Sequence, residues 1–156
     1  MRKTLFLSAA VLVAAIPSVA GAGTPDASVR AKLEASNVPF EVDSDGDYKV
    51  VVNYKSEGRT QLVYVRSAVE TWGKSRVREV WSYAYEGEFN ALIGNRLLEA
   101  SYKLKLGSWV KQNDRALMVV KLDAGADAEE LQNAISFAAE VADEMEKELT
   151  DGKDAF

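Results

Sequence analysis

The spacing of hydrophobic positions changes several times along the chain, and each spacing predicts a different element. Apolar and polar residues alternate over 40–42 and 48–54 on either side of Asp43-Ser44-Asp45-Gly46-Asp47, which is typical of a β-hairpin around an Asp/Gly turn. Alternation predicts further strands over 61–65, 76–85, 106–111 and 115–122, the last two joined by a turn at 112–114. Between them, Glu70–Lys74 indicates a strand ending or a loop.

Helical spacing appears in three segments. A short helix is expected over 26–36, with Thr24 as its N-cap and Pro25 in its first turn. A second is expected over 88–104. Its apolar positions are Phe89, Leu92, Ile93, Leu97, Ala100 and Leu104.

The most regular helix pattern follows Asp127 and Glu130, which form a variant of the capping box. An apolar stripe follows it, formed by Leu131, Ile135, Ala138, Ala142, Met145 and Leu149, and the opposite side carries Glu140, Asp143, Glu144, Lys147 and Glu148. We expect the stripe to pack on the protein's own sheet, with self-association as the alternative. Residues 151–156 form a polar tail.

This order of elements, α-β-β-β-(β)-α-β-β-α, predicts the α+β class. Short hairpin connections favour a twisted, mostly antiparallel sheet of five to six strands, with the helices on one face. Residues 23–150 are expected to form one domain.

The first 22 residues are typical of a secretory signal peptide. Arg2 and Lys3 precede the apolar run Leu5–Ile16, and small residues precede a predicted cut after Ala22. The run is shorter than the roughly 20 residues of a spanning helix. We therefore expect a periplasmic or secreted protein without membrane insertion after cleavage.

Composition narrows the possible chemistry. The chain has 19 Lys and Arg against 24 Asp and Glu, which disfavours nucleic acid as a partner. It contains no His and no Cys, the side chains of common nucleophilic triads and zinc sites. We expect no enzymatic activity, no catalytic or metal-binding residues and no cofactor.

Two groups of acidic residues are candidate sites. Asp43, Asp45 and Asp47 suit a calcium loop less well than a turn, because a strand follows Gly46 at once. A small hydrolase would need a pair of carboxylates, for which Glu70, Glu79, Glu86 and Glu88 are candidates, although none lies in a recognisable motif.

Aromatic residues supply the candidate binding surface. Trp81, Tyr83 and Tyr85 share one side of a strand, and Trp109 lies on a later one. If exposed, they would form a platform for a peptide or protein partner. Aromatic residues on a sheet that meets helices are more often core, which is the interpretation we favour.

The order of several short motifs resembles the YbjN-like family of bacterial proteins. These motifs are residues 40–48, 61–65 and 78–82, residues 104–109, and the capped terminal helix. The resemblance implies a fold similar to class I type III secretion chaperones and a loosely described role in sensory transduction regulation, and it brings no catalytic residues. The export signal departs from many relatives.

These observations favour an exported binding or chaperone-like module that contacts a protein or peptide partner in the bacterial envelope. The alternative is a regulatory or sensory accessory protein that acts through a membrane partner, and a small hydrolase is less favoured. The chaperone-like resemblance also makes a homodimer an expectation.

Overall fold

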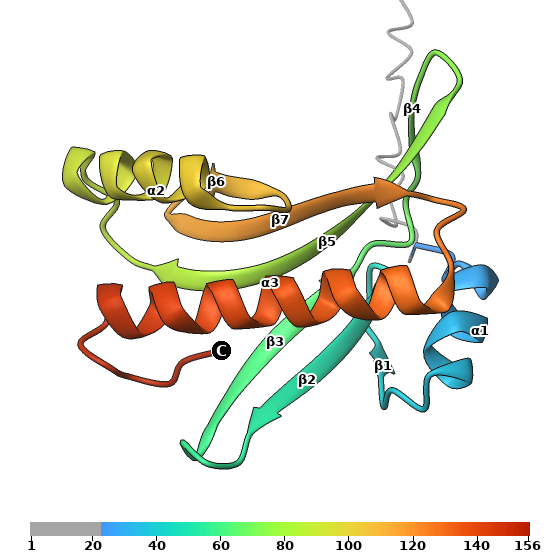
Figure 1. The fold of residues 1–156 in the computed structure, drawn as a ribbon, viewed down its shortest axis with the longest axis horizontal. Helices are drawn as coiled ribbons and strands as arrows, with labels where there is room; N and C mark the ends of the chain where they lie inside the picture. The colour runs from blue at the N-terminus through green and yellow to red at the C-terminus, as the bar shows by residue number, and fades with distance from the viewer. Residues whose placement is uncertain (1–22) are drawn as a thin grey trace, which may run out of the picture.

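The computed structural model describes residues 23–156, so the predicted signal peptide and its cut after Ala22 lie outside the described residues. These residues adopt the α+β class, with three helices beside an open antiparallel sheet of seven strands (Figure 1). The helices are α1 (Ala27–Ala35), α2 (Ala91–Lys103) and α3 (Ala128–Leu149). The strands are β1 (Glu41–Val42), β2 (Tyr48–Tyr54), β3 (Arg59–Val65), β4 (Glu70–Trp72), β5 (Ser75–Glu86), β6 (Ser108–Gln112) and β7 (Arg115–Asp123). Within 23–156, no helix is both long and apolar enough to span a bilayer.

The strands follow the order β1-β2-β3-β5-β7-β6, and each neighbouring pair is antiparallel. The predicted fold class is confirmed, with one strand more than expected. The addition is β4, because Glu70–Lys74 forms a short strand and a tight turn at Gly73 that leads into β5. All of β4 is exposed, so it lacks the apolar alternation that reveals the other strands. This hairpin projects from the sheet at the top of Figure 1.

The long helix α3 crosses β3, β5 and β7 and supplies much of the core. Its start is confirmed as a capping box: Asp127 Oδ1 accepts from the Glu130 N–H at 2.9 Å, and the Glu130 carboxylate accepts from the Asp127 N–H at 2.9 Å. The predicted stripe faces the sheet. Its buried members include Leu131, Ile135, Ala138, Ala142 and Met145.

The prediction that Asp143 lies on the solvent side of this helix is wrong. Asp143 and Glu146 are both buried because they point at Arg59 of β3. Arg59 Nε donates to Asp143 at 2.6 Å, and Arg59 Nη2 donates to Glu146 at 2.9 Å. Lys147 adds a contact to Asp143 at 2.7 Å. Charged side chains are tolerated in the interior only when such partners offset the loss of their hydration.

The helix α2 begins after Asn90, whose side chain accepts from the Ile93 N–H at 3.0 Å, and therefore starts later than the expected residue 88. Leu92, predicted among the core positions, is 80% exposed. The inward side carries Ile93, Leu97 and Ala100.

The helix α1 is capped by Asp26, and not by Thr24 as predicted. Asp26 Oδ1 accepts from the Ser28 N–H at 2.7 Å, while Oδ2 accepts from the buried Arg78 of β5 at 2.5 Å. Burial opposes ionisation of this carboxyl group, but the hydrogen bonds from Ser28 and Arg78 outweigh it and lower the pKa of Asp26 to about 2. One side chain thus joins the helix start to the sheet.

Replacing Asp26 by Asn keeps a good N-cap and removes the charge facing Arg78. We expect Asp26→Asn to lower the free energy of unfolding at pH 7 by about 2 kcal/mol, as for other charged hydrogen bonds. Because the folded pKa lies below the unfolded value of about 3.9, this stabilisation is present above pH ~4 and is lost as the pH falls toward 2. Urea titrations of both proteins across this range measure it. A difference that stays constant with pH would contradict the assignment.

Candidate functional site

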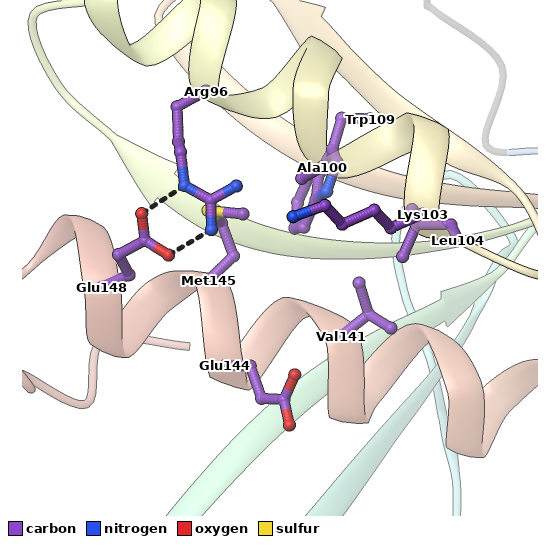
Figure 2. A pocket seen from close by; sticks show the side chains of 9 residues that line it. All are labelled: Arg96, Ala100, Lys103, Leu104, Trp109, Val141, Glu144, Met145 and Glu148. Carbon is purple, nitrogen blue, oxygen red and sulfur yellow. Dashed lines mark hydrogen bonds and ion pairs between the residues drawn. The ribbon is translucent and has the colours of Figure 1, made fainter.

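A groove separates α2 from α3 on the helix-covered side of the sheet (Figure 2). Its floor is apolar and encloses a cavity of about 200 Å³. A second cavity of about 320 Å³ continues along α3 and shares Lys103, Leu104, Val141 and Glu144 with the first. The floor residues of this α2–α3 groove are Ala100, Leu104, Trp109, Phe137, Val141 and Met145. The sequence pattern assigns most of them to the core and gives no sign that the two helices leave a space between them.

The two walls of the groove carry opposite charges. The wall formed by α2 and the residues after it bears the cations Arg96, Lys103 and Lys105. The wall formed by α3 bears Glu140, Glu144 and Glu148. An occupant with an apolar side and with charges of opposite sign on its two flanks would match both walls.

One ion pair bridges the two walls at one end of the groove. Arg96 Nε lies 2.5 Å from Glu148 Oε1, and Arg96 Nη2 lies 2.6 Å from Glu148 Oε2 (Figure 2). The hydrogen bond from Arg96 lowers the pKa of Glu148. Both side chains are partly exposed, so the pair ties α2 to α3 more than it stabilises the fold.

The floor contains an unusual donor. Trp109 is 8% exposed, and its indole Nε1–H has no hydrogen-bond partner among the described residues. Its backbone N–H donates to the Ser101 side chain at 3.0 Å, which fixes β6 against α2. Lys103 lines the same cavity and extends over the floor in Figure 2. Because a buried donor without an acceptor is costly, this position favours an occupant that brings an acceptor.

The outer side of α2 is also apolar. Leu98 is 70% exposed and Tyr102 is 93% exposed, beside the exposed Leu92. Another pocket, of about 200 Å³, opens between α2 and β6 on this outer side, with Trp109 and Val110 in its lining. Trp109 therefore lies beneath α2 with open space on both sides of the helix.

The predicted aromatic residues divide between the two faces of the sheet. Trp109 is core, as favoured, because its strand partner Met118 faces the helices. Trp81 and Tyr83 are half-buried and lie outside the core, so the expectation that helices cover them is wrong, whereas Tyr85 is half-buried but packs against the core beside Phe89. The alternation of β5 instead turns its intervening residues toward α3. Those buried positions are Arg78, Val80, Ser82 and Ala84.

Trp81 and Tyr83 form an aromatic stripe on the open face of the sheet, and other side chains cover part of this stripe. The Arg66 guanidinium lies 4.3 Å from the Trp81 ring centroid, and the Arg115 guanidinium lies 5.3 Å from that of Tyr83. Phe156 stacks on Tyr83, with ring centroids 5.9 Å apart. These contacts occupy the faces that a partner would use, so the stripe is a weaker candidate than the groove.

The acidic candidates are engaged in structural roles. Asp43 accepts from the N–H groups of Asp45 and Asp47 at 2.9 Å, which forms the predicted turn with Gly46 at φ 81°. The buried Asp47 accepts from the Ser67 N–H at 2.7 Å and pairs with an arginine. No cluster of metal-ligating side chains occurs within 23–156.

The carboxylates proposed for a hydrolase do not form an isolated pair. Glu70 and Glu79 line one pocket, but Glu79 already accepts from Trp81 Nε1 at 2.8 Å and pairs with Lys121 at 3.1 Å. Glu86 pairs with Arg115 at 2.9 Å. At Glu88, the backbone carbonyl accepts from the hydroxyl of Tyr85.

Comparison with protein-family models gives no match, and comparison with curated proteins gives no significant match. The resemblance to the YbjN-like family and the chaperone-like subtype of the fold therefore stay predictions.

Removing the Arg96 tie tests its role in the groove. We expect Glu148→Gln to change the free energy of unfolding by less than about 1 kcal/mol, since the pair is solvated. We also expect the amides of α2 to exchange with deuterium faster, because the tie to α3 is lost. Mass spectrometry of exchanged peptides measures this. Glu144→Gln is the matched control, because Glu144 lines the same groove and has no ion pair within the described residues. Equal exchange in the two variants would contradict the role of the tie.

Proposed function

We propose that this protein is an exported, non-enzymatic binding module whose α2–α3 groove accepts an amphipathic helix of a protein partner in the bacterial envelope. The observation that carries the proposal is the groove itself, in which an apolar floor with an unpaired buried donor lies between walls of opposite charge. The chaperone-like role predicted from the sequence is of the same kind.

A helix suits the groove because two helices already form its walls. The apolar stripe of a third helix would pack on Val141, Leu104 and their neighbours, as amphipathic helices do in hydrophobic grooves of other proteins. Acidic residues on one flank would meet Lys103, and basic residues on the other would meet Glu144. This charge pattern also fixes the direction of the helix, because reversing it would place like charges together.

The Trp109 indole supplies selectivity within the apolar floor. The indole nitrogen is buried, so the floor has to open before an Asn, Gln or Ser side chain of a partner helix can accept from its N–H. A partner without an acceptor would leave the donor buried and unpaired, which discriminates strongly against it. The proposal thus specifies an apolar stripe, flanks of opposite charge and one internal acceptor.

Binding to model helices tests the proposal. The probe is a fluorescein-labelled synthetic helix of about five turns with a leucine stripe, one Asn within the stripe, and one acidic and one basic flank. We expect fluorescence anisotropy to show binding that Val141→Asp weakens by about tenfold or more, because the substitution places a charge on the groove floor.

Two controls make this result specific. Glu129→Gln changes an exposed residue in the first turn of α3 and should bind like the unmodified protein. Helices with two acidic or two basic flanks should bind more weakly than the mixed one. If the mixed helix binds the unmodified protein and Val141→Asp equally, the groove is not the site. If a second copy of the chain occupies the groove, light scattering will show the mass of a dimer.

Export is tested by the mass of the protein recovered from the periplasm after expression of the full chain. We expect the chain to begin at Gly23, because small residues precede the predicted cut after Ala22. Recovery of the full-length chain from the cytoplasm alone would contradict export and leave the groove proposal intact.

A further inference from the structure

The last six residues described, 151–156, fold back into a split in the sheet. β3 and β5 pair over Val63–Val65, whereas β3 extends to Arg59 and β5 to Glu86. Below this short pairing the two strands diverge, and the end of the chain lies in the angle between them, beside α3 (Figure 1). We call residues 151–156 the tail segment.

Two buried charged side chains bind the backbone of the tail segment. Arg59 Nη1 donates to the carbonyl of Gly152 at 3.0 Å. Glu146 Oε1 accepts from the N–H of Ala155 at 2.6 Å. Arg59 is 9% exposed and Glu146 is fully buried, so these contacts form inside the protein. Asp151 and Gly152 adopt left-handed backbone angles in the turn that ends α3, so the contacts that an extended peptide can reproduce are those of residues 153–156.

The neighbouring contacts add a preference for an aromatic residue. The Thr60 N–H donates to Asp154 at 3.3 Å, and the Thr60 hydroxyl donates to the carbonyl of Phe156 at 3.4 Å. The Phe156 ring stacks on Tyr83, whose edge contact with Tyr64 places it on the open face of the sheet. The tail segment therefore runs from the α3 side of the sheet to the aromatic stripe. We call Arg59, Thr60, Tyr83 and Glu146 the backbone cradle.

Most of the tail segment is open to solvent. Residues 151–155 are exposed, and Phe156 is half-buried. If the tail segment left, Arg59 would lose one acceptor and Glu146 one donor in a buried position. An empty cradle is therefore unfavourable, whereas exchange of the tail segment for another peptide with the same backbone pattern is not.

We infer that the backbone cradle is a second binding site, which takes an extended peptide with an aromatic residue in place of Phe156 and which the tail segment occupies in cis. In this arrangement the tail segment is an internal competitor that sets a threshold for the incoming peptide. Residues 153–156 show the ligand chemistry, because they make the contacts that an extended peptide in trans would make. The site is separate from the α2–α3 groove and does not rest on the proposed function.

The test weakens the tail segment and offers a peptide in its place. Ala155→Pro removes the N–H that Glu146 accepts, and Phe156→Ala removes the ring on Tyr83. The probe is a fluorescein-labelled peptide with the sequence of residues 150–156. We expect it to bind the full-length double variant at least about tenfold more tightly than the unmodified protein, because the competitor in cis is weakened.

Several controls decide the outcome. A probe with Pro in place of the residue equivalent to Ala155 should bind the double variant at least about tenfold more weakly than the normal probe. Lys153→Ala should behave like the unmodified protein, because the Lys153 side chain makes no hydrogen bond or ion pair within the described residues. Phe156→Ala alone should shift binding in the same direction as the double variant, which covers a folding defect caused by proline.

The inference is overturned if the probe binds the tail variants no more tightly than the unmodified protein. Equal binding of the two probes to the double variant would also overturn it, because the Glu146 contact would then select nothing. A failure of helix binding at the α2–α3 groove would leave these results unaffected.

Discussion

The buried pairing of Arg59 with Asp143 and Glu146 sets how α3 lies on the sheet. The two carboxylates are three residues apart on the helix, and one guanidinium on β3 binds both. A rotation of the helix would leave one carboxylate buried without a partner, and breaking such a pair is strongly destabilising. Burial raises the pKa of Glu146, because the charged carboxylate is less favourable away from water. Apolar side chains would fill this space without such demands, so the cluster is better understood as a device for orientation than as a source of stability.

The orientation of α3 places different chemistry on its two flanks. The flank with Asp143 and Glu146 faces the split between β3 and β5 and holds the tail segment. The flank with Val141, Glu144 and Glu148 faces α2 and forms one wall of the groove. A helix register that satisfies Arg59 therefore also determines which side chains line the groove.

The sequence predicts the elements of this fold better than its surfaces. The hairpins and the capped start of α3 depend on local patterns, so they could be predicted from neighbouring residues. The strand β4 could not, because its residues are all exposed and carry no alternation. The burial of Asp143 and Arg78 could not be predicted either, because charged residues are normally expected at the surface. Each is a charged residue that partners distant in the sequence make acceptable inside the protein, and a single sequence does not reveal such pairs.

The candidate site shows the same limit. Trp109 could be predicted as a notable residue, but its unpaired N–H depends on how α2, α3 and β6 meet. Aromatic side chains such as those of Trp81, Tyr83 and Tyr85 suggest either a core or a contact surface. In the structure Trp81 and Tyr83 form a face covered in part by arginine side chains and by Phe156, a third arrangement that neither interpretation contained, while Tyr85 packs against the core.

The two proposed sites would select their ligands by different physical means. In the α2–α3 groove, apolar burial would supply affinity, and the charged walls with the Trp109 indole would supply direction and selectivity. In the backbone cradle, the ligand's main chain would supply most contacts, and one aromatic ring would supply the preference. The interior of a helix cannot use the cradle, because its backbone carbonyl and N–H groups are already paired within the helix. In an extended peptide the backbone carbonyl and N–H groups are unpaired, so they can bind the cradle. The secondary structure of a ligand therefore decides which of the two sites it enters.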